Sequence, residues 1–204
     1  MRFFSVFGTL ALAAFAYATP LANPEPVPAA ANDVQVAARG GCSSCKSLPG
    51  IIVDVTLQVT PHVDYLKSLP AEQCTVETIK PVIVEIKGIL QTAISDVEAL
   101  VGSALDLVLH TVTGVLSLLN LCKLIATLYN LIFGCFGIVL KVVVSAEYDE
   151  VCALFAEVGV LLGTLLKLII DLVGGVLAIV QGLLAALLPT ITVIGCKDSF
   201  YYLY

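Results

Sequence analysis

Cysteine is the residue type with the most evident chemistry in this chain. Behind a secretory leader, a set of cysteines predicts a disulfide framework, because oxidising compartments preserve S–S bonds. The count is odd, so one thiol is left unpaired, and the spacing leaves open which one it is and how the other six are joined. The seven disulfide candidates are Cys42, Cys45, Cys74, Cys122, Cys135, Cys152 and Cys196.

One bridge can be suggested from the predicted helices. Cys135 lies ten residues before Ser145, and Cys152 lies seven residues after it. If Ser145 marks the turn between two antiparallel helices, a rise of about 1.5 Å per residue places the two thiols at levels about 4 to 5 Å apart. Cys135 and Cys152 are therefore candidates for one disulfide.

The same residue types could instead bind a metal ion. Cys42 and Cys45 form a C-x-x-C pair, and His62 and Cys74 follow it. Structural zinc sites usually combine two close ligand pairs, and the second close pair is missing here. A redox C-x-x-C would lie between a strand and a helix of a βαβ unit, which the sequence does not predict. The disulfide interpretation is favoured, and no metal site is predicted.

His110 is the residue best suited to act as a catalytic base. Asp106 and Ser103 precede it by one and two turns of a predicted helix, but side chains on one helix face point outward and do not converge on a substrate. The chain has no G-x-S-x-G, no H-E-x-x-H and no Gly-rich phosphate loop. We expect no enzyme activity, no catalytic residues and no cofactor.

The charge distribution argues against nucleic acid as a partner. The formal net charge is -6, and the ten Lys and Arg residues are scattered singly, whereas phosphate binding depends on clustered cations. Adsorption to a membrane would therefore be hydrophobic and not electrostatic.

The N-terminal residues have the composition of processing segments. Residues 1–18 combine a basic start, an apolar run and a small-residue ending, which predicts a signal peptide, with a membrane anchor as the alternative. Residues 19–41 are rich in Pro and Ala, which predicts a linker or propeptide, with Arg39 as a candidate processing residue. The helical domain is expected at 42–204.

Apolar residues spaced by three and four predict helices over most of that domain. An amphipathic helix is expected at 51–68, although its β-branched residues also permit a strand, and Pro61 should kink or divide it. From residue 78 a long helical zone follows, interrupted by a new helix start at Ser145.

Further along, a glycine pair is expected to divide the last long helix. This pair is Gly174-Gly175, and Pro189 is expected to end the helical pattern, with 191–194 extended. The predicted fold is an all-α, disulfide-linked bundle of about four to six strongly apolar helices.

The apolar content exceeds what one small core normally uses. Hydrophobic residues make up 59% of the chain and charged residues 13%, so surplus apolar surface is expected. Charge-free stretches of 17 and 25 residues occur at 124–140 and 172–196, where about 20 residues are needed to cross a bilayer. The alternative interpretation is therefore an integral membrane protein with about two spans, near 124–140 and 172–194.

Gly159 and Gly163 would suit that alternative. Their small-x-x-x-small spacing lets apolar helices pack closely in lipid. Regular stripes of polar residues along the helices favour a bundle with solvated edges, because helices that face lipid on all sides do not need such stripes.

Several segments resemble a known group of proteins. The leader, the C-x-x-C pair, residues 74–88 and the segments at 139–143 and 151–155 resemble uncharacterised small secreted hydrophobic proteins of basidiomycete fungi. In character the chain is also similar to fungal hydrophobic-surface-binding proteins, which are helical and adsorb to apolar solids. It does not match the eight-cysteine hydrophobin pattern.

Composition and resemblance together predict a secreted, non-enzymatic protein of the cell wall or extracellular space, possessing either surface activity or an apolar binding site. The expected partners are apolar surfaces or lipids, with association to membranes and self-association through the same apolar patches.

Overall fold

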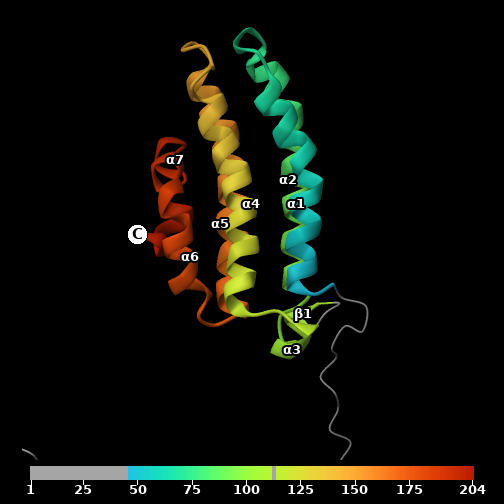
Figure 1. Ribbon diagram of the computed structural model, residues 1–204. Helices are drawn as coiled ribbons and strands as arrows, with labels where there is room; N and C mark the ends of the chain where they lie inside the picture. Colours follow the sequence, from blue (N-terminus) through green and yellow to red (C-terminus); the bar gives the residue numbers. More distant parts are fainter. Residues whose placement is uncertain (1–45, 112–113) are drawn as a thin grey trace, which may run out of the picture. The chain divides into compact units, whose positions relative to one another are not determined.

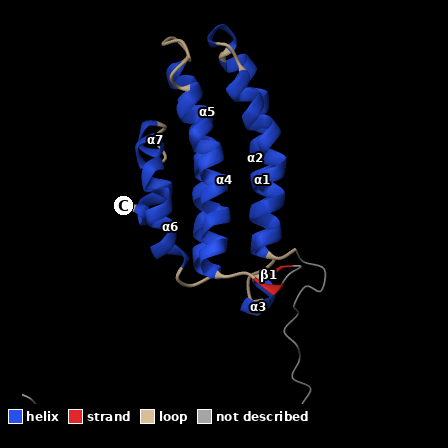
Figure 2. Ribbon diagram, in the orientation of Figure 1, coloured by secondary structure: helices blue, strands red, loops and turns tan. Residues whose placement is uncertain are grey.

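The computed structural model of the chain describes residues 46–111 and 114–204. The predicted signal peptide and the whole of the predicted linker lie outside the described residues, as do Cys42 and Cys45. Within the described part, seven α-helices are joined by short 3-10 helices and one two-stranded hairpin (Figure 2). The all-α prediction is confirmed for this part of the chain.

Four long helices run side by side, alternating in direction along the chain (Figure 1). In chain order, α1 packs along α2 and α4, and α2 packs along α5. Each helix buries positions spaced by three or four residues, such as Ile79, Ile83 and Ile86 of α2, because these positions share one helix face. The four long helices are α1 (Leu48–Ser68), α2 (Val76–Glu98), α4 (Leu118–Val139) and α5 (Tyr148–Leu172).

Side-chain caps mark two of the helix starts. The hydroxyl of Thr75 accepts the N–H of Thr78 at 3.4 Å, and Ser117 accepts the N–H of Asn120 at 3.4 Å, so both act as N-caps. The helix predicted at 51–68 is confirmed as α1, and it is not divided at Pro61. Pro61 is exposed, where water can satisfy the carbonyl group that a proline leaves without a donor.

The predicted continuous helical zone is wrong between α2 and α4. A short helix and a hairpin form there, because Gly102 and Gly114 adopt positive φ angles of 86° and 121°, which a helix does not accommodate. The connection covers one end of the bundle, the lower end in Figure 1. Its elements are α3 (Leu105–Val108), β1 (His110–Thr111) and β2 (Gly114–Val115), with β1 and β2 antiparallel.

The C-terminal part follows the sequence prediction at one break and departs from it at another. The division at the glycine pair is confirmed, because α5 ends at Leu172 and Gly175 precedes α6 with a φ of 84°. The predicted end at Pro189 is wrong, because this proline lies in the first turn of α7, where its missing N–H removes no helical bond. These last elements are α6 (Val176–Leu184), η2 (Ala185–Leu187), α7 (Leu188–Val193) and η3 (Lys197–Leu203).

Aromatic side chains fill the space between α4 and α5. Phe136 of α4 stacks on Phe155 of α5, with ring centroids 4.0 Å apart. Phe200 of η3 meets Tyr129 and Phe133 of α4 edge to face, at centroid distances of 6.3 and 5.7 Å. All five rings are fully buried. The C-terminal segment is therefore part of the core.

The predicted disulfide linkage is not supported. The described residues include five cysteines, all of them free thiols. The Cys135 thiol faces α1 and donates to the carbonyl oxygen of Val63 at 3.6 Å, whereas Cys152 lies beside Tyr148 on α5. The suggested Cys135–Cys152 bridge is therefore wrong, because similar height along two helices does not make two side chains face each other.

Candidate apolar binding site

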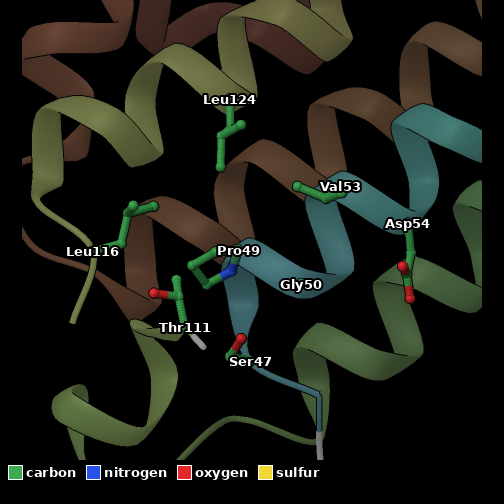
Figure 3. Close-up of a pocket in the computed structure, with 8 residues that line it drawn as sticks. All are labelled: Ser47, Pro49, Gly50, Val53, Asp54, Thr111, Leu116 and Leu124. Carbon is green, nitrogen blue, oxygen red and sulfur yellow. The ribbon is translucent and has the colours of Figure 1, made fainter. Parts of the chain in front are cut away.

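An apolar pocket lies where α1, the hairpin connection and α4 meet (Figure 3). The side chains of Val53, Leu116 and Leu124 approach one space from these three elements. The pocket volume is about 290 Å³, at the small end of the range of about 300 to 1,000 Å³ usual for ligand sites, so it suits a short apolar group. It is lined by Ser47, Pro49, Gly50, Val53, Asp54, Thr111, Leu116 and Leu124.

The pocket exists because α1 carries more apolar residues than its inward face needs. Ile52, Val55 and Val59 occupy the buried side of the helix. Val53 points off that side and stays 40% exposed, and Leu124 of α4 is half-buried in the same way. The two residues therefore present apolar surface that no other part of the described chain covers completely.

Two of the polar side chains of the pocket are already engaged in other contacts. Asp54 points away from the apolar residues (Figure 3) and pairs with Lys46 at 2.6 Å. The hydrogen bond to Asp54 raises the pKa of Lys46. The Thr111 hydroxyl donates to the carbonyl oxygen of Gly114 at 2.6 Å. Recognition in this pocket would therefore depend on apolar contact and shape.

Exposed apolar side chains are the second feature of this end of the molecule. Of the described residues, seventeen large apolar ones are exposed. Five of these lie in the turns and short elements between α2 and α4, and in the first turn of α4. We call these five residues the apolar tip: Val101, Leu105, Leu107, Val115 and Leu119.

A polar cleft at the other end of the bundle has a structural role. The Glu147 carboxylate accepts the backbone N–H of Val76 at 2.6 Å, so it caps α2 from just before α5. Glu77 and Glu150 line the same cleft. Ser145 was predicted to be the N-cap of α5. It is not, because α5 begins at Tyr148 and Glu147 occupies the N-cap position.

A third hollow lies between α4, α5 and α7, with a volume of about 240 Å³. It mixes polar and apolar residues, and Lys141 and Tyr148 are among them, so it is less apolar than the pocket beside the hairpin. Pro189, Thr190 and Val193 of α7 line it.

The described cysteines are poor nucleophiles. Burial raises the pKa of Cys135 to about 12 and that of Cys196 to about 11. Burial also raises the pKa values of Cys74, Cys122 and Cys152. The thiolate is the reactive form of cysteine, so burial favours the protonated, less reactive form of these five side chains.

The residues considered for metal binding and catalysis lie in separate places. Over residues 46–111 and 114–204, no group of three His, Cys, Asp or Glu side chains is arranged to hold a metal ion. His62 is half-buried in α1, and Cys74 is buried beyond the end of that helix. His110 is exposed in β1, and Asp106 is in α3, so the single helix face expected for His110, Asp106 and Ser103 is wrong.

Gly159 and Gly163 receive the C-terminal segment of the chain. A methyl group at Gly163 would lie 2.6 Å from the carbonyl oxygen of Ser199, and one at Gly159 would meet the side chain of Cys196. The Tyr202 hydroxyl donates to the carbonyl oxygen of Gly163 at 2.8 Å. Sequence reasoning missed this docking, for which the only signal was a glycine pair together with an aromatic C-terminus.

Three helical segments are long and apolar enough to cross a membrane, judged by length and composition. The two spans of the membrane interpretation, near 124–140 and 172–194, overlap the first and the third of them. The second, α5, was not predicted because Glu157 and Lys167 interrupt its apolar sequence. The three segments are Leu118–Val139, Tyr148–Leu172 and Val176–Val193.

Comparison with known proteins adds no analogue for this arrangement. No protein-family profile, curated protein or solved structure matches the chain. The functional argument therefore starts from the pocket and the exposed apolar residues themselves.

Proposed function

We propose that this chain is a secreted, non-enzymatic protein that binds apolar ligands such as lipids or adsorbs to apolar surfaces. It would act in the extracellular space or cell wall of a fungus, as the resemblance to small secreted basidiomycete proteins implies. The observation that carries the proposal is the apolar pocket beside a set of exposed leucine and valine side chains. Its partners would be lipids or apolar solids, and self-association would use the same surface.

The physical reason is the free energy of apolar surface in water. Covering such surface stabilises a complex by about 25 cal/mol per Å², and ordinary monomers rarely expose apolar patches larger than a few hundred Å². Leu105, Leu107 and Val101 each keep more than half of their surface exposed. Contact with an apolar phase would remove this surface from water.

A pocket variant tests the ligand-binding part of the proposal. Val53→Asp places a charge on the pocket wall, whereas Leu57→Asp places one a turn further along α1, on an exposed residue that does not line the pocket. With a fluorescent fatty acid as the probe, we expect Val53→Asp to weaken uptake about tenfold or more and Leu57→Asp to leave it near wild type.

The wild-type chain itself tests the proposal more broadly. Purified without detergent, the mature protein should lower surface tension and bind apolar beads. A monodisperse soluble protein with no surface activity and no fatty-acid uptake would rule the proposal out.

An integral membrane protein is the second candidate, and the three apolar helical segments favour it. In that case α4, α5 and the α6–α7 segment would cross the bilayer, and their interrupting polar residues would face other helices. Carbonate extraction of membranes separates the two candidates, because a spanning protein stays in the pellet and an adsorbed one is released. Insolubility of the purified chain without detergent would also favour the membrane candidate.

A further inference from the structure

The apolar tip contains five exposed aliphatic residues, and α3, which carries two of them, lies at the lower end of the helical bundle in Figure 1. Leu105 and Leu107 of α3 are 51% and 59% exposed, and Val115 of β2 is 57% exposed. Val101 and Leu119 flank them at 66% and 50%. The five residues come from consecutive elements of one connection, so they share one end of the bundle.

Several backbone N–H groups of the described part of this connection form internal hydrogen bonds. The N–H groups of Leu107 and Leu109 donate to Ala104 and Leu105 at 2.9 and 3.0 Å. The N–H of Leu116 donates back to Leu109 at 2.9 Å across the hairpin. Internally bonded peptide groups can leave water at much lower cost than free ones, so the tip is suited to an apolar environment.

Charge decides which apolar environment fits. Residues 99–111 and 114–119 contain Asp106 and no Lys or Arg. Of the ionic groups next to this end, Asp54, Asp96 and Glu98 are acidic, and Lys46 and Lys123 are basic, with Lys46 paired to Asp54. A surface of anionic lipid would repel these carboxylates, whereas a zwitterionic lipid layer would not.

The other candidate faces fit a lipid surface less well. The opposite end of the bundle carries Glu72, Lys141 and Glu147 in its turns. The charge-free α6–α7 face exposes small residues such as Ala178 and Ala185 together with two larger ones, Leu183 and Val193, so it offers fewer large aliphatic side chains than the tip. The tip therefore combines five exposed Leu and Val side chains with a single charged residue, Asp106.

We propose that the apolar tip enters the surface of a zwitterionic lipid layer, so that the bundle attaches by its end and not by the side of its helices. This inference rests on the proposed function, and it names the residues that would enter the lipid and the class of lipid that the protein would bind. Thr111 and Leu116 of the same connection line the apolar pocket.

Tryptophan substitution locates the inserted face directly, because the chain contains no tryptophan. Leu107→Trp places the probe on the tip, and Val84→Trp places it on α2, at a residue of similar exposure (56%). With vesicles of phosphatidylcholine, we expect the fluorescence of Leu107→Trp to shift to the blue and that of Val84→Trp to stay unchanged. A shift at Val84→Trp alone would overturn the inference, since the bundle would then lie on its side.

Charge substitution tests the same surface by affinity. The double variant Leu105→Asp with Leu107→Asp should bind phosphatidylcholine vesicles about tenfold or more weakly. The matched control, Val84→Asp with Val160→Asp, adds the same charge to exposed helix faces and should bind as the wild type does. Wild-type binding should weaken when half of the lipid is replaced by phosphatidylglycerol.

The outcomes separate this inference from the proposed function. If the wild type binds apolar beads and vesicles but the tip variants bind equally well, the tip inference is wrong and the proposed function stands. If the wild type binds neither beads nor vesicles, the proposed function fails. If the tip variants abolish a dimer seen by sedimentation without lipid and bind vesicles as the wild type does, the tip is a self-association face and the lipid assignment is overturned.

Discussion

Two glycines on α5 decide how closely the end of the chain approaches the bundle. At Gly163 the backbone of Ser199 lies so near that an added methyl group would be 2.6 Å from its carbonyl oxygen, well inside normal contact distance. Gly88, in the interior of α2, has no atom within 4 Å of the same added group. The two positions are therefore a matched pair in which only the surroundings of the methyl group differ.

We expect Gly163→Ala to destabilise the protein by about 1 to 3 kcal/mol, because the docked segment must move to make room. Gly88→Ala should stabilise it by about 0.5 to 1 kcal/mol, because alanine loses less backbone freedom than glycine when a helix forms. Urea unfolding of both variants measures the two effects. Changes of equal sign and size would mean that the C-terminal segment does not dock on Gly163.

Among the secondary-structure elements, η3 completes the core between α4 and α5. Its Phe200 is fully buried against Tyr129 and Phe133. Further contacts hold the segment in place, since the Gln181 side chain donates to the carbonyl oxygen of Tyr202 at 3.0 Å. A short 3-10 helix with few internal hydrogen bonds is ordered here by what it packs against.

Phe200→Ala should therefore lower the free energy of unfolding by about 3 to 5 kcal/mol, as is typical when a buried aromatic ring is removed. The neighbouring Tyr201 is 66% exposed, and Tyr201→Ala should change stability by no more than about 0.5 kcal/mol. Denaturant titration of the two variants, with a hydrophobic dye to detect an opened core, measures the difference. A mild effect of Phe200→Ala would show that η3 only covers a core that is complete without it.

At the scale of the whole molecule, buried thiols and phenols link stability to pH. Burial raises the pKa of Cys135 from 9.0 to about 12 and that of Cys196 to about 11, and it also raises the pKa of the buried Tyr129. Above pH 9 the unfolded chain loses these thiol protons while the native chain keeps them. The unfolded state therefore binds fewer protons, and stability decreases as pH rises.

We expect the free energy of unfolding to fall between pH 9 and about 12, because the contribution of the protonated thiols is complete below pH 9 and is lost above it. A variant with Cys135→Ala and Cys196→Ala should show a shallower decrease, even if it is less stable at neutral pH. Chemical unfolding at a series of pH values gives both slopes. Parallel curves for the variant and the wild type would contradict this account.

The sequence by itself determined most of the helical structure, because its signals are local. Apolar residues three and four positions apart predicted α1 and most of α2, and the glycine pair before Val176 predicted the break between α5 and α6. Sparse charge predicted surplus apolar surface, and exposed leucines such as Leu107 agree with it. Each of these features depends on residues within a few turns of one another.

Only the tertiary structure decided the features that join distant residues. Phe200 and Ser199 dock on α4 and α5, and Glu147 caps α2. Cys135 points toward α1. All three features depend on which helices become neighbours. The connection between α2 and α4 likewise carries an apolar spacing that fits a helix, but it turns at its glycines and closes the end of the bundle. Apolar spacing shows which residues leave water, and packing determines which neighbours they meet.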